Sequence, residues 1–172
     1  ICERLREAAF LLSNLKITVV DENTKQKEEF FYTEGIKSFV NFVNQNKTTI
    51  SNTFYISQKD SKTGIEVEIG LQYNDGYSET IISFANNVKT RDGGSHESSF
   101  KLALTKAIND YAREKGFLKS KDINFDGSDI REGLVAIISV KVPEALLEFV
   151  GQTKDKLSTP EVLKHGNRYG IK

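Results

Sequence analysis

One short stretch near the carboxyl end, GQTKDKL at residues 151–157, combines residue types that suit the binding of an anion. Lysine carries a compact positive charge on a long stem, which suits contact with a terminal phosphate. In an extended backbone, residues i and i+2 project to the same side, so Gln152 and Lys154 are predicted to converge on one anion. Gly151 would let the backbone approach that anion closely. Residue types alone nevertheless favour a solvated loop.

Three other places hold polar groups that could do chemistry, and a structural interpretation is favoured for each. The stretch TRDGGSHE, residues 90–97, pairs glycines before a helix, but it has no Walker-type GxxxxGKS pattern. We interpret it as a tight loop with a structural His96. The stretch GSDIREG, residues 127–133, predicts a local ion pair before a strand. Lys101 lies in the first turn of a predicted helix, where the dipole mildly disfavours a cation. This position points to another use, although a surface lysine is the default interpretation.

Strands and helices that must position these residues follow one another along the chain. Spacing of the apolar residues predicts a helix over residues 3–12, strands in KITVV and EEFFY, a helix opening at Gly35, and a strand in TFYIS. Strict alternation over residues 65–73 predicts a half-buried strand. The turn signal Asp75-Gly76 then predicts that ETIISFANNV, residues 79–88, returns as its hairpin partner.

A long helix is predicted next, with Ser95 as its N-cap and Gly116 as its stop. Its predicted buried stripe consists of Phe100, Leu104, Ala107, Ile108 and Tyr111. The run LVAIISVKV, residues 134–142, is short, apolar and β-branched, which indicates a strand buried on both faces. This order of elements favours one sheet with helices packed on one side.

Composition excludes several classes of function. The formal net charge is zero, which argues against a general electrostatic grip on nucleic acid or on an acidic membrane. The single cysteine excludes an internal disulfide and suits a reducing cytoplasm, and two distant histidines predict no metal site. No apolar stretch has the length of a membrane span. The absence of methionine leads us to expect a fragment of a longer protein.

Several motifs together closely resemble the transducer domain of type IIA topoisomerase B subunits, which are those of bacterial DNA gyrase and of topoisomerase IV. They are RLREAAFLL, YTEGIKSFVNFVN, LQYNDGYSETIISFANNVKTRDGGSHE, LTKAINDYA, and GSDIREGLVAIISVKVPE followed by GQTKDKL. The resemblance covers Arg4 to about Glu161, so residues 1–161 are assigned to the transducer domain and residues 162–172 to a frayed tail or remnant. The long segment EALLEFVG, with AFLL and GFLKSKD, favours topoisomerase IV over gyrase.

The resemblance implies a fold and site roles that the spacing does not show. The fold would be α+β, a two-layer sandwich of the ribosomal protein S5 domain 2-like type with a left-handed crossover. Lys154 would contact the γ-phosphate of ATP bound in the preceding domain, Gln152 would contact the same region, and Gly151 and Thr153 would shape the loop. Lys101, where the family usually has arginine, would face the cavity through which DNA passes.

The resemblance also implies partners and cofactors. The intact B subunit would use ATP and Mg²⁺, with Mg²⁺ held by the preceding ATPase domain, while the fragment alone would bind neither and be inactive. The partners would be that ATPase domain, the following cleavage domain, an A-type subunit, double-stranded DNA, and a second copy of the B subunit when ATP is bound. Two alternatives are a nucleic-acid-binding module of the same fold and the second domain of a mismatch-repair or chaperone ATPase.

Overall fold

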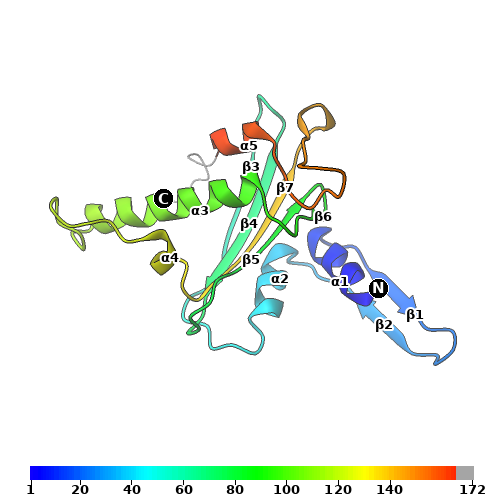
Figure 1. Cartoon of the computed structure of the whole chain (residues 1–172). Helices are drawn as coiled ribbons and strands as arrows, with labels where there is room; N and C mark the ends of the chain where they lie inside the picture. The colour runs from blue at the N-terminus through cyan, green and yellow to red at the C-terminus, as the bar shows by residue number, and fades with distance from the viewer. Residues whose placement is uncertain (166–172) are drawn as a thin grey trace.

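A mixed five-stranded sheet forms the centre of the described structure (Figure 1). The computed structural model describes residues 1–165, and side chains as far as residue 162. In chain order the elements are α1 (Cys2–Leu11), β1 (Ile17–Val20), β2 (Lys27–Phe30), α2 (Ile36–Val43), β3 (Phe54–Lys59), β4 (Glu66–Tyr73), β5 (Thr80–Ala85), β6 (Val88–Lys89), α3 (Ser95–Glu114), α4 (Gly127–Ile130), β7 (Leu134–Lys141), the 3₁₀ turn η1 (Glu144–Leu146) and α5 (Pro160–His165).

Strand β7 lies in the middle of the sheet, whose order is β3-β4-β7-β5-β6. It pairs antiparallel with β4 and parallel with β5. All of its residues except the last, Lys141, are buried. A continuous apolar, β-branched run is what a strand covered on both faces requires, so the prediction for residues 134–142 is confirmed.

The predicted hairpin between residues 65–73 and 79–88 is wrong. Strand β7 lies between β4 and β5, and β4 pairs instead with β3, with Phe54 opposite Leu71. The turn at Asp75-Gly76 serves a connection across the sheet, in which the Asn74 backbone N–H donates to Gly133 O at 2.9 Å. The strand that is apolar on both faces takes the central position, where helices cover both of its faces.

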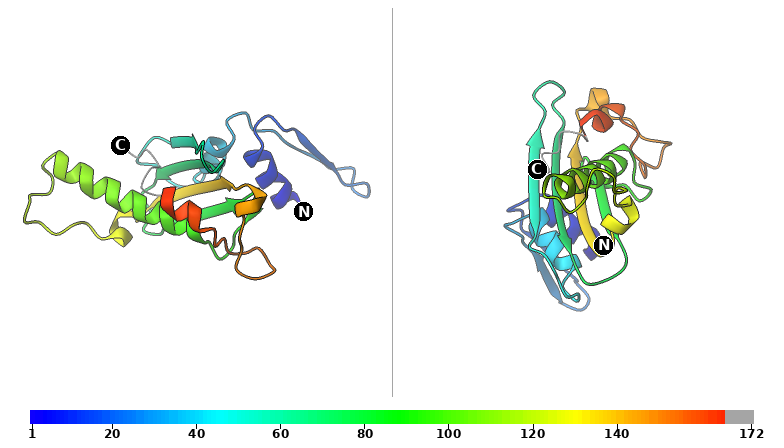
Figure 2. Two further views of the ribbon diagram at one scale, coloured as in Figure 1. Left: turned by 90° about the horizontal axis from the view of Figure 1, so that it is seen from above. Right: turned by 90° about the vertical axis from the view of Figure 1, so that its left-hand side faces the viewer.

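Helices cover both faces of the sheet, whereas the sequence predicted only one. Helix α3 packs on one face with α5 beside it (Figure 2), and α2 with α1 packs against the other. The close approach of α2 requires a glycine, because a Cβ on Gly70 would lie 2.7 Å from Ile36 Cγ2 and 2.9 Å from Val40 Cγ2. The α+β sandwich class predicted from the sequence is confirmed by this arrangement.

The long helix differs in detail from its prediction. Phe100 and Leu104 are buried as predicted, but Tyr111 is 54% exposed, because α3 runs past the edge of the sheet (Figure 1). Gly94 holds the N-cap position and Ser95 is the first helical residue. Gly116 follows the end of the helix with φ +78°, as a stop residue does.

Two further segments complete the fold. Strands β1 and β2 pair as a separate two-stranded sheet that projects from the body of the molecule (Figure 1). At the carboxyl end, Pro160 begins helix α5, and Val162 is fully buried in the core beneath α3. The predicted boundary after residue 161 therefore falls inside a helix; residues 166–172 of the predicted tail lie outside the described residues.

Candidate functional site

The lysine loop, residues 151–157, is a turn and not an extended segment. Gly151 has φ +77° and Lys154 has φ +58°, both in the left-handed region. The convergence of Gln152 and Lys154 was predicted from an extended backbone, so that argument is wrong. Gly151, Gln152, Thr153 and Lys154 are all exposed, and neither the Gln152 nor the Lys154 side chain has a hydrogen bond or ion pair with any described residue.

Backbone hydrogen bonds to the segment before the lysine loop, residues 148–150, fix one side of the base of the loop. The backbone N–H of Val150 donates to Lys156 O at 2.8 Å, and that of Ser158 donates to Glu148 O at 2.9 Å. The Thr159 hydroxyl oxygen accepts from the Glu148 N–H at 3.1 Å. Leu157 is 1% exposed and belongs to the core under α3. The loop therefore presents an exposed tip on a fixed base.

The other side of the base is held by the segment that opens α3, residues 92–94. The Asp92 N–H donates to Asp155 O at 2.9 Å, the Leu157 N–H donates to Gly93 O at 3.1 Å, and the Ser95 N–H donates to Leu157 O at 2.9 Å. The sequence predicted only a tight loop for this glycine pair. The pair of glycines was the one signal available, but nothing in it identified Leu157 as the partner.

His96 has the structural role that the sequence predicted. It is fully buried, and its Nε2 lies 3.0 Å from the Thr90 hydroxyl. That hydroxyl in turn donates to the Ser83 backbone oxygen at 2.9 Å. Burial lowers the pKa of His96 from 6.5 to about 4. The imidazole is therefore neutral at neutral pH and ties α3 to β5.

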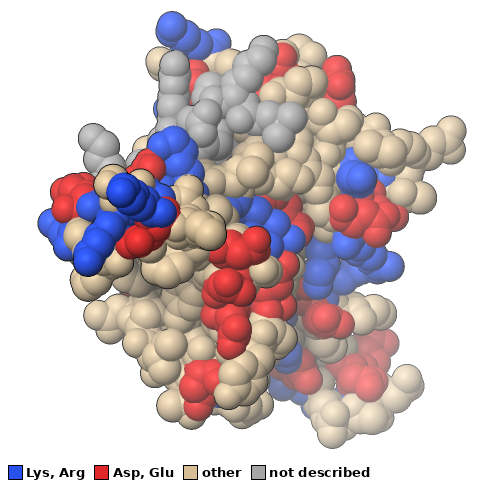
Figure 3. All heavy atoms as spheres, turned by 60° about the vertical axis from the view of Figure 1, so that its left-hand side comes forward, with Lys and Arg blue, Asp and Glu red and all other residues tan. Residues whose placement is uncertain are grey.

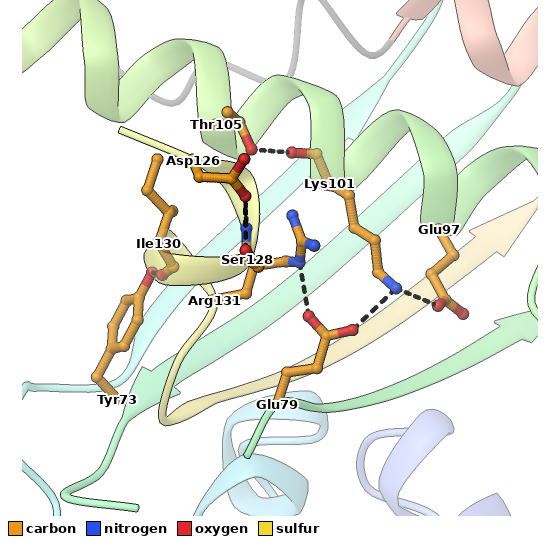
Figure 4. A network of polar contacts seen from close by, with 9 residues as sticks. All are labelled: Tyr73, Glu79, Glu97, Lys101, Thr105, Asp126, Ser128, Ile130 and Arg131. Carbon is orange, nitrogen blue, oxygen red and sulfur yellow. Dashed lines mark hydrogen bonds and ion pairs between the residues drawn. The ribbon is translucent and has the colours of Figure 1, made fainter. Parts of the chain in front are cut away.

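Lys101 lies in a group of four charged residues between α3 and the start of β5 (Figure 4). Its Nζ is 3.0 Å from Glu79 Oε1 and 3.1 Å from Glu97 Oε1, and the Arg131 Nε is 2.6 Å from Glu79 Oε2. Partial burial lowers the pKa of Lys101, but the hydrogen bonds and charges of Glu79 and Glu97 outweigh it and raise that pKa overall. The four charges cancel within the group.

The ion pair predicted within residues 127–133 is wrong. The partner of Arg131 is Glu79, on the connection before β5, and not a neighbouring acid. Glu97 stands four residues before Lys101 on α3, a spacing that the sequence displays. Sequence spacing could not identify Glu79 as a partner, because it is far from Lys101 and Arg131 in the chain and only the folded structure brings them together. Figure 3 shows acidic and basic side chains interleaved on this side of the molecule, with acidic ones gathered at its middle.

An open depression of about 480 Å³ adjoins this group, lined by Lys101, Thr105, Asn109 and Arg131 among others. No group of three or more acidic, histidine or cysteine side chains suited to a metal ion occurs among the described residues. None of the helices in the described part of the chain is long and apolar enough to cross a membrane.

Comparison with known proteins identifies the family. The sequence model of the DNA gyrase B family matches residues 35–168. The chain belongs to the DNA gyrase B family of type IIA topoisomerase subunits. The B subunit of DNA topoisomerase 4 from Enterococcus faecalis is 56% identical over 93% of the chain, and that from Bacillus subtilis is 55% identical over 92%. The chain spans only 23% and 24% of these two relatives.

Solved structures of topoisomerase ATPase regions contain the same fold. The 43K ATPase domain of Thermus thermophilus gyrase B, in complex with an aminocoumarin, superposes with a TM-score of 0.85 at 33% identity, over 99% of this chain and 45% of that one. The ATPase region of Saccharomyces cerevisiae topoisomerase II is 15% identical, with a TM-score of 0.59 over 99% of this chain and 41% of that one, and shows the fold alone. The resemblance predicted from the sequence motifs is therefore confirmed.

Proposed function

We propose that the chain is the transducer part of an ATP-dependent type II DNA topoisomerase of the topoisomerase IV kind. Its lysine loop would sense the γ-phosphate of ATP held by a preceding ATPase domain and relay the nucleotide state to DNA strand passage. One observation carries this proposal: Lys154 stands exposed, without a partner among the described residues, at the tip of a loop whose base is hydrogen-bonded on both sides.

The donor set of the loop fits a phosphate. Lys154 would hold the γ-phosphate through its ammonium group, and the Gln152 amide would donate to the same region. Gly151 and Thr153 would shape the turn, since Gly151 has a positive φ of +77°. ATP supplies the hydrolysis energy when bound. The Mg²⁺ that accompanies ATP would be held by the ATPase domain, with no ligand from residues 151–154.

The magnitude of one lysine contact limits what it can do alone. A hydrogen bond to a charged group contributes about 1.5–3 kcal/mol, which shifts a population by at most about a hundredfold. A complete reversal of a two-state equilibrium needs about 5.5 kcal/mol. Lys154 is therefore one contributor, and Gln152 together with ATP-dependent pairing of two B subunits would supply the remainder.

The proposed assembly follows from the family. The ATPase domain would precede this chain and the cleavage domain would follow it, an A-type subunit would complete the cytoplasmic enzyme, and a DNA duplex would pass through the cavity. We also propose that Lys101 faces that cavity, because its side chain is 30% exposed beside the open depression. The zero net charge gives no support to an independent nucleic-acid-binding module.

The deciding experiment is Lys154→Ala in the intact B-type chain, assembled with its A-type partner. We expect ATP turnover to fall about tenfold to a hundredfold, because the charged contact to the γ-phosphate is lost. The melting temperature should not change, since the side chain is exposed. Lys156→Ala is the matched control, as it removes an exposed lysine from the same loop. Equal ATP turnover in the two variants would contradict the proposed role of Lys154 in sensing the γ-phosphate.

A further inference from the structure

We propose that Gly94 is a positioning residue for the lysine loop, acting through the backbone of Leu157. This inference rests on the proposed role of Lys154. Gly94 forms a parallel β-bridge with Leu157, the residue that ends the loop. Hydrogen bonds at 3.1 Å from the Leu157 N–H to Gly93 O and at 2.9 Å from the Ser95 N–H to Leu157 O flank this bridge. A third, from the Asp92 N–H to Asp155 O at 2.9 Å, lies inside the loop.

The closeness of the two backbones requires glycine at residue 94. A Cβ built on Gly94 would lie 2.2 Å from Leu157 O and 2.6 Å from Leu157 N. These are backbone atoms of a residue that is 1% exposed, so they cannot move aside as the end of a flexible side chain can. The φ of Gly94 is +141°, a conformation that side-chain-bearing residues rarely adopt.

The site of this contact links the loop directly to the long helix. Gly94 is the N-cap of α3, and Ser95, which donates to Leu157 O, is its first residue. Glu97, in the first turn of α3, pairs with Lys101. A displacement of the loop backbone when Lys154 binds a γ-phosphate would therefore be transmitted to the start of α3 through backbone contacts, with no flexible side chain between the loop backbone and the helix.

The test uses Gly94→Ala in the intact B-type chain assembled with its A-type partner. We expect the kcat for ATP to fall about tenfold or more, comparable to Lys154→Ala, because the added Cβ forces Leu157 away and the loop tip loses its position. The double variant Gly94→Ala/Lys154→Ala should turn over ATP no more slowly than Lys154→Ala alone, since both changes remove the same contact between Lys154 and the γ-phosphate. Gly116→Ala is the control for backbone strain, because Gly116 also has a positive φ but a Cβ there meets nothing within 4 Å.

Amide hydrogen exchange separates a displaced loop from an unfolded domain. In Gly94→Ala, the amides of Asp92, Ser95 and Leu157 should exchange faster while those of β7 stay protected. Wild-type ATP turnover in a folded Gly94→Ala variant, or losses that add to those of Lys154→Ala, would overturn the inference. So would unchanged exchange at the three amides in a variant that turns over slowly.

If the Gly94→Ala variant does not fold, amide hydrogen exchange of the wild-type protein tests the inference instead. A non-hydrolysable ATP analogue should then raise the protection of the Asp92, Ser95 and Leu157 amides, and unchanged protection would overturn the inference. The proposed function fails in a different way. It fails if Lys154→Ala turns over ATP at the wild-type rate, whereas the inference fails if Lys154→Ala is slow and Gly94→Ala is not.

Discussion

The Arg131 Nε donates to Glu79 Oε2 at 2.6 Å, although the two residues are 52 positions apart in the chain. The other oxygen of the same carboxylate accepts from the Lys101 ammonium at 3.0 Å (Figure 4). One glutamate therefore occupies two cations that border the open depression beside α3. A DNA phosphate that approached Lys101 in the proposed cavity would have to compete with this internal carboxylate.

The first prediction follows from that competition. Glu79→Gln removes the negative charge but keeps the size of the side chain, so Arg131 loses its carboxylate partner and Lys101 keeps only Glu97; both cations then become more available to phosphate. We expect the intact enzyme to bind DNA more tightly, with a slope of log affinity against log salt that steepens by about one for each additional DNA phosphate that is neutralised. Stability should fall by no more than about 1 kcal/mol, because the pair is partly exposed to solvent.

Glu132→Gln provides the comparison for this measurement. Glu132 is an exposed acid in the same connection as Arg131, so its removal changes the net charge equally without touching the ion-pair group. DNA affinity and salt slope should move less in Glu132→Gln than in Glu79→Gln. The same response in both variants would show that only overall charge matters and that Glu79 does not mask the cations.

The second prediction concerns pH. Burial holds the pKa of His96 at about 4, below its ordinary 6.5, so the unfolded chain binds a proton in this window that the folded chain does not. Stability therefore falls as pH drops below about 6.5, and the loss continues until the pH reaches the folded value. Between pH 7 and pH 5 we expect the free energy of unfolding to decrease by about 2 kcal/mol from this residue.

Urea denaturation of the chain at several pH values measures that change. His96→Gln keeps a side chain able to bond with the Thr90 hydroxyl but cannot take up a proton in this range. The variant should be less stable at pH 7, and its stability should vary less between pH 7 and pH 5 than that of the wild type. Parallel pH profiles for the two chains would contradict the assignment of the pH dependence to His96.

Much of the fold could be read from local patterns, and the errors came from long-range pairing. The uninterrupted apolar run of β7 predicted burial on both faces, because a strand of that kind has no face suited to water. The turn at Asp75-Gly76 predicted a hairpin because such signals are local. It could not reveal that β7, which begins at residue 134, inserts between β4 and β5.

The alternating strand shows the same limitation. Gln72 occupies a position that the alternation assigned to solvent, yet it is 7% exposed. Its side-chain oxygen accepts from the Asn44 amide at 2.8 Å, and its own amide donates to Ser51 O at 3.0 Å. Partners at distant positions made this buried polar side chain possible, since a buried amide requires hydrogen bonds. Alternation alone carries no information about them.

The sequence indicated the residue types of the candidate site but not its geometry. The lysine, amide and glycine of the loop were identified from the sequence. The turn was not, because a positive φ at Lys154 has no residue signature of the kind that glycine provides. The contact between Gly94 and Leu157 joins residues 63 positions apart and depends on two backbones only. Side-chain patterns therefore contain no trace of it beyond the glycine itself.

The last prediction separates the observed role of Lys101 as an ion-pair partner from its proposed role as a cavity cation. Lys101→Ala leaves the Glu97 carboxylate without its cation and Glu79 with Arg131 alone. In the intact enzyme, we expect DNA relaxation per ATP hydrolysed to fall, because the proposed cavity would then present two acids and one fewer cation. Lys101→Arg should retain the coupling, since a guanidinium keeps the charge and offers donors to both carboxylates. The measurement is the ratio of relaxation rate to ATP turnover, with the melting temperature of each variant as a check on folding. Lys101→Ala with an unchanged ratio would assign the lysine to stability alone, and its role in the cavity would be wrong.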